Sequence, residues 1–191
     1  MKKKQILALA AAVILISLSA QGTLTYFTAE TVTHNVITSG HVRIALEEKQ
    51  ELTPGVETDF PAEGIDQALP GDRISKIVRV RNTGSADAWV RIELEISASA
   101  GDAALPSILP NGNAVVTATP LPGWCVGADG LYYYEEKLPP GAVTPPLIRE
   151  VRLDPRMDRL YQGCQVTVSV KAHAVQADHN GSTVSEAVGW P

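Results

Sequence analysis

The sequence AWVRIELEI, residues 88–96, alternates apolar and polar side chains over its whole length. A period of two is typical of a β-strand with one buried face and one solvent-facing side. We therefore expect Val90 and Ile92 to face a core, and Arg91 and Glu93 to face solvent. This stretch decides the fold class, because an α-helix would place these apolar residues on all sides.

The same alternation recurs along the chain and predicts further strands. Pro70-Gly71-Asp72 and Asn82-Thr83-Gly84 are typical turn sequences that separate such runs. Many short antiparallel strands at this spacing favour a β-sandwich or a β-barrel, so we predict an all-β fold. The other candidate strands lie at residues 42–46, 78–81, 114–119, 131–137, 147–153 and 166–174.

Helical signals are few. Asp154-Pro155 has the pattern of a helix N-terminus, and it predicts a two-turn helix that ends before Gly163. Thr183 and Glu186 have the spacing of a capping box and predict a second short helix. Residues 50–70, rich in Pro, Gly and acidic residues, are expected to form one long surface loop.

Length and charge narrow the possible classes. The chain has 191 residues, which suits one domain. Its net charge of -5, with charged residues at only 19%, excludes a basic nucleic-acid-binding domain.

The N-terminus predicts export. Lys2–Lys4 precede the apolar run Ile6–Leu18, as in a secretory signal peptide. Small residues at Thr23 and Thr25 predict cleavage after Thr25, which would leave a single mature domain, residues 26–191, that begins at Tyr26. The partner at this stage is a signal peptidase, and the membrane is contacted only through residues 1–25. The alternative is an uncleaved membrane anchor.

Two cysteines, Cys125 and Cys164, lie in the predicted mature chain. In an exported protein an even number of thiols favours a disulfide, which we expect between these two residues. Two free thiols or a catalytic cysteine are the alternatives. Neither has a second cysteine at metal-binding spacing.

No motif for catalysis or for a cofactor occurs in the sequence. It lacks HExxH, a GxSxG elbow and a glycine-rich phosphate loop, so we expect no cofactor and no enzymatic activity. His173 falls on the polar face of a predicted strand, where a solvated side chain is expected. Tyr132–Tyr134 reads as a strand with Tyr133 on one face and its neighbours on the other, or as a sugar- or partner-binding surface.

Residues 26–38 carry one charge, Glu30, and contain neither Pro nor Gly. Such a β-prone stretch is poorly protected against pairing with an open sheet edge. It either stays on its own subunit as an edge strand or adds as a donor strand to the next subunit. The residues expected to carry this contact are Tyr26, Phe27, Val32 and Val36.

Several motifs, in their order, resemble the TasA/camelysin family of secreted proteins from Gram-positive bacteria. The likeness covers most of the chain, and its residues are Gly22-Thr23-Leu24-Thr25-Tyr26-Phe27, Ser39-Gly40, Leu69-Pro70-Gly71-Asp72, Asn82-Thr83-Gly84, Asp129–Tyr134 and Trp190. The resemblance implies a jelly-roll-like β-sandwich, export through a SipW-type signal peptidase, and a structural role in surface or biofilm fibres. Camelysin-type members are labelled metalloproteases, but this sequence has no zinc-binding motif that would carry the label over.

Three classes of function follow. The first is a secreted structural subunit of extracellular matrix fibres, whose partners are further copies of itself and an accessory matrix protein. The second is a monomeric surface or matrix-associated binding module. The third is a camelysin-type metalloprotease.

Overall fold

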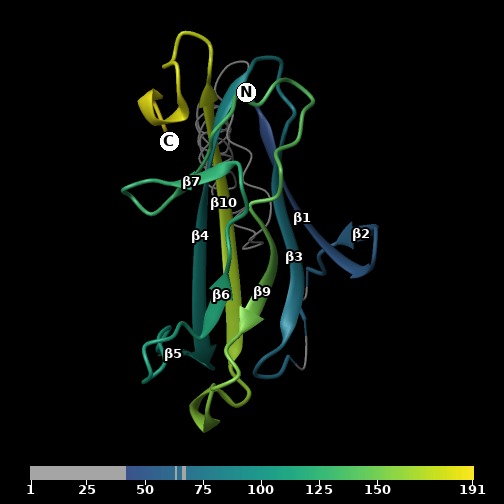
Figure 1. The fold of residues 1–191 in the computed structure, drawn as a ribbon, viewed down its shortest axis with the longest axis vertical. Helices are drawn as coiled ribbons and strands as arrows, with labels where there is room; N and C mark the ends of the chain where they lie inside the picture. The colour runs from purple at the N-terminus through teal and green to yellow at the C-terminus, as the bar shows by residue number, and fades with distance from the viewer. Residues whose placement is uncertain (1–41, 63, 66–67) are drawn as a thin grey trace, which may run out of the picture. The chain divides into compact units, whose positions relative to one another are not determined.

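The computed structural model describes residues 42–62, 64–65 and 68–191. These residues form ten β-strands and two short 3-10 helices (Figure 1). The predicted signal peptide and donor strand lie outside them, as do the residues predicted at the cleavage site and in the assembly contact: Thr25, Tyr26, Phe27, Val32 and Val36.

The strands form two antiparallel sheets. The first has the order β2-β1-β3-β9-β6, and the second has the order β10-β4-β8-β7, with β5 paired to the end of β4. The first sheet contains β1 (Ile44–Thr53), β2 (Val56–Asp59), β3 (Arg73–Asn82), β6 (Val116–Ala118) and β9 (Ile148–Leu153). The second contains β4 (Ala88–Ala100), β5 (Ala103–Leu105), β7 (Trp124–Val126), β8 (Tyr132–Tyr134) and β10 (Gln165–Gln176).

One hydrophobic cluster joins the inner faces of both sheets, so the predicted all-β antiparallel sandwich is confirmed. Val90 and Ile92 are fully buried in it, opposite Ala174 and Ala172 of β10. Arg91 lies on the other face of β4, as the alternation predicts.

Asn82 explains why the Asn82-Thr83-Gly84 turn has its sequence. Its side chain is fully buried and its Nδ2 donates hydrogen bonds to the carbonyl oxygens of Ala86 and Leu138, both at 2.8 Å. Its Oδ1 accepts from the backbone N of Gly84 at 2.9 Å. An amide satisfies two acceptors and one donor at once, so this residue fixes the connection from β3 to β4.

The two-turn helix predicted after Asp154 is shorter than expected. The Asp154 carboxylate accepts hydrogen bonds from the backbone N and the guanidinium of Arg156 instead of capping a helix. The helical part reduces to the 3-10 turn η1 (Arg159–Tyr161), capped by Asp158 through a bond from Leu160 N. The second predicted short helix forms as the 3-10 turn η2 (Val184–Glu186), directly after Thr183, but the Thr183 side chain does not cap it.

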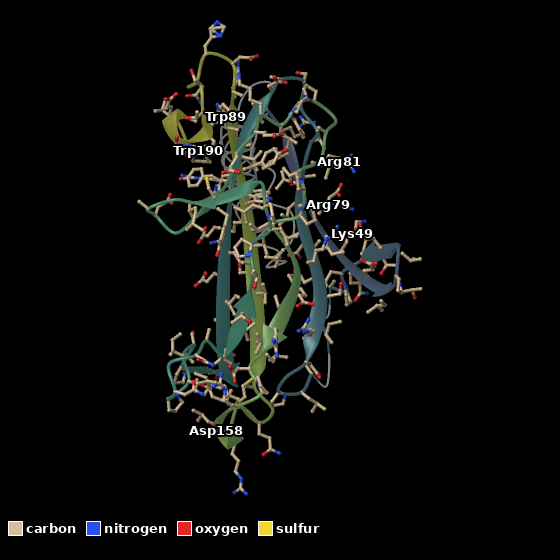
Figure 2. All side chains as sticks on the ribbon, in the orientation of Figure 1. Lys49, Arg79, Arg81, Trp89, Asp158 and Trp190 are labelled. Atoms are coloured by element: carbon tan, nitrogen blue, oxygen red, sulfur yellow. The ribbon has the colours of Figure 1, made fainter. Side chains whose placement is uncertain are left out.

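The prediction of one long loop over residues 50–70 is also wrong. Pro54 and Gly55 form a tight turn, with Gly55 at φ 79°, and β2 returns from it to pair with the end of β1. Arg79 of β3 reaches across β1 to bind Glu57 of β2 at 2.7 Å and also binds Glu47 at 2.9 Å. This network lies on the outer face of the first sheet, where Figure 2 labels Arg79, and it ties the hairpin to the sheet.

Candidate assembly surface

Strand β10 forms one edge of the second sheet. It pairs with β4 along all 12 of its residues, and no other strand among the described residues pairs with it. In an edge strand, alternate residues direct their N–H and C=O groups away from the sheet. This row of backbone groups extends for about 40 Å at the usual rise per residue.

The sequence of β10 contains few of the features that protect an edge strand. Natural edges are guarded by proline, by bulges or by several charges. Strand β10 reads QVTVSVKAHAVQ, with one lysine, no proline and no glycine, and its register with β4 is unbroken. The edge is therefore competent to accept another strand.

The core is incompletely covered at one end of this sheet. Val170, Ala172 and Ala174 of β10 are buried, whereas Val166 and Val168, which point to the same side, are only half-buried. Leu94 and Ile96 of β4, next to them, are also half-buried. An added strand beside β10 would cover apolar surface here as well as pair its backbone.

On the outer face, β10 and β4 are joined by charged side chains. Lys171 binds Glu93 at 3.3 Å, and His173 Nε2 lies 3.9 Å from the same carboxylate. The side chain of His173 is only 17% exposed, so the expectation of a solvated histidine is wrong. Burial lowers the pKa of His173 and the neighbouring Arg91 lowers it further, which keeps the imidazole neutral near pH 7.

The C-terminal segment, residues 178–191, folds back over the outer face of the second sheet; we call it the strap. Trp89 Nε1 donates to the carbonyl of Asn180 at 2.9 Å, and the Arg91 guanidinium lies 4.7 Å from the ring centroid of Trp190 (Figure 2). Arg91 also donates to the carbonyl of Pro191. The strap and the outer face of the sheet together form a second apolar cluster. Its residues are Trp89, Val175, Ala177, Val184, Ala187, Tyr133 and Trp190.

The tyrosine cluster is a strand, as one of the two interpretations predicted. Tyr134 packs against Trp124 in the main core, with ring centroids 5.4 Å apart. Tyr133 lies on the opposite face, edge-on to Trp190 at 5.8 Å, and its hydroxyl donates to Asp129. Because the strap packs against Tyr133, the tyrosine cluster does not offer an open aromatic surface on which a sugar could bind.

The structure contradicts the predicted disulfide. Cys125 and Cys164 are both free thiols. Cys125 lies opposite Tyr133, which pairs with Arg91, whereas Cys164 directly precedes the β10 residue that pairs with Ser99. Positions 91 and 99 of one strand are about 27 Å apart, and a disulfide needs Cα atoms within about 7 Å.

The described residues do not fit a zinc centre. Catalytic zinc needs three protein side chains as ligands, and no group of three His, Cys, Asp or Glu in the described part of the chain is placed to hold a metal ion. His173 has a carboxylate nearby, but the cations Arg91 and Lys171 act on it as well, which disfavours a bound metal. No helix of the described residues is long and apolar enough to cross a membrane.

Sequence reasoning missed the acceptor edge and the strap, since both depend on which segments meet in space. In comparisons with known proteins, residues 1–104 match a family model described as camelysin metallo-endopeptidase. This match includes β1 to β4 and ends before β10 and the strap. No curated protein and no solved structure matches the chain.

Proposed function

The chain belongs to the camelysin family, which includes TasA, and from this premise we propose that it is a secreted structural subunit that assembles into extracellular matrix fibres. Proteins of this family are surface-associated or secreted. In our proposal a signal peptidase removes residues 1–25, and the mature chain begins at Tyr26.

The observation that carries the proposal is the edge of β10. The predicted donor, residues 26–38, has 13 residues and matches the 12 residues of β10 in length. Its backbone would pair with the β10 edge of the next subunit, as in other cases of strand addition. Each subunit then donates one strand and accepts one, and such a head-to-tail contact propagates into a filament.

Charge and apolar surface support the same pairing. The donor carries a single acid, Glu30, and the acceptor strand a single base, Lys171. The half-buried Val166 and Val168 give the donor an apolar surface to cover. The proposal contains no proteolytic step, although the family description names a peptidase, because the described residues do not fit a metal centre.

Electron microscopy of the secreted protein tests this function. We expect protein whose N-terminus is sequenced as Tyr26 to form filaments when incubated at acidic or neutral pH. The uncleaved precursor is the control, and it should not polymerise because its donor strand is continuous with the signal segment. Dispersed monomers of the mature protein at both pH values would instead favour a monomeric binding module.

A further inference from the structure

A second stretch of open backbone lies in the middle of β4, on the side opposite β10. Strand β8 pairs there with Arg91 and Ile92, and β5 pairs with residues 98–100. Between them, Glu93–Ser97 pairs with no other strand of the described chain on this side. We call these five residues the β4 notch; in Figure 1 it lies between the β7–β8 hairpin and β5.

A small apolar hollow opens beside the β4 notch. Its volume is about 110 Å³, and the exposed Ile108, with 55% of its surface accessible, stands at its rim. A cavity of about 150 Å³ holds one benzene molecule, so this hollow can take one aliphatic side chain. Its apolar lining comes from Ile96, Ala98, Ile108, Ala114, Val115 and Val116.

The outer side of the β4 notch is acidic. Glu93 and Glu95 point away from the core, next to each other on one face of β4. Glu93 forms an ion pair with Lys171, whereas Glu95 is exposed and forms no ion pair with any side chain of the described residues. A strand that paired here would meet carboxylates on its outer face and an apolar surface on its inner face.

We propose that the β4 notch binds an extended segment of a partner protein in which basic and apolar residues alternate. Its backbone would pair with Glu93–Ser97, one apolar side chain would enter the hollow, and its basic side chains would lie opposite Glu93 and Glu95. The donor strand of this chain is a poor occupant, since its one charge, Glu30, is acidic. The site is on the other side of β4 from β10, so it does not depend on fibre assembly.

A pair of synthetic peptides tests this inference on the mature chain. One is a fluorescent seven-residue peptide of alternating lysine and valine, and the other replaces each lysine with glutamate. We expect the lysine peptide to bind and to slow amide hydrogen exchange at Glu93–Ser97. The E95K variant should bind it about fivefold to tenfold more weakly and should prefer the glutamate peptide. The control E135K changes an exposed charge about 20 Å further along the sheet and should leave the affinity unchanged.

Three further outcomes distinguish the proposal from its rivals. A lysine peptide N-methylated at alternate positions should bind more weakly, because strand pairing needs its backbone N–H groups. Equal binding of the lysine peptide to E95K and to the parent would overturn the proposal. Protection of Glu93–Ser97 on self-association without peptide would overturn it too, and would identify a second copy of the chain as the occupant.

Discussion

Replacing Val90 or Ile92 with aspartate is expected to lower the free energy of unfolding by more than about 3 kcal/mol. Both side chains are fully buried between the two sheets. Aspartate would lose the apolar contacts and bury a carboxylate with no partner. For a chain of this size, thermal unfolding should occur roughly 6–12 °C lower.

The matched control is Glu93→Ala, on the same strand but on its outer face. Glu93 is partly exposed and pairs with Lys171, so its loss should cost about 1 kcal/mol or less. Circular dichroism melts of the three variants make the comparison. Similar melting temperatures for all three would show that the inward and outward faces of β4 are assigned wrongly.

Deletion of Tyr26–Ile37 is expected to abolish filament growth while leaving a folded monomer. The described residues 42–62, 64–65 and 68–191 have a core of their own, which the β4–β10 ladder helps to hold together. Without its donor strand, a subunit can still accept the strand of a neighbour, but it has no strand to donate and cannot extend the filament. Circular dichroism and size-exclusion chromatography check the fold, and electron microscopy checks the filaments.

Adding the missing segment in trans provides the control. A synthetic peptide of residues 26–38 should bind the truncated protein and should slow filament growth of the full mature chain by occupying β10. A peptide of the same composition in scrambled order should do neither. If the truncated protein still forms filaments, or does not fold, the segment is not a donor and belongs to its own subunit as an edge strand.

The strands and their inward faces could be predicted from the sequence because the alternation is local. Val90 and Ile92 are buried and Arg91 lies on the other face, as the period of two requires. Residues 166–174 proved to be part of β10 for the same reason. Both strands are longer than predicted: β4 keeps its alternation through Ala98 and ends at Ala100, and β10 extends from Gln165 to Gln176.

Features decided by competing hydrogen bonds were predicted less well. Asp154 had the position of a helix cap, but its carboxylate binds Arg156 locally, so the predicted helix shortens to one 3-10 turn. Glu186 accepts from Ser182 N instead of completing a capping box with Thr183. The turn at Pro54-Gly55 carried a hairpin signal that the acidic composition around it obscured.

Long-range contacts could not be predicted at all. The disulfide was predicted from export and an even cysteine count. The fold, however, places the two thiols far apart along the strand direction of the sheet. Nothing in the sequence around Trp190 indicated that its ring would pack against Arg91 and Tyr133. The edge position of β10 depends on the strand order, which no local pattern encodes.

Amide hydrogen exchange, followed by mass spectrometry on the mature monomer and on its filaments, tests strand addition at β10 most directly. Alternate amides of Gln165–Gln176 should exchange rapidly in the monomer and become protected in the filament, while the short edge strand β7 stays unchanged. Protection of the whole of β10 already in the monomer, or exchange there that polymerisation does not slow, would contradict it.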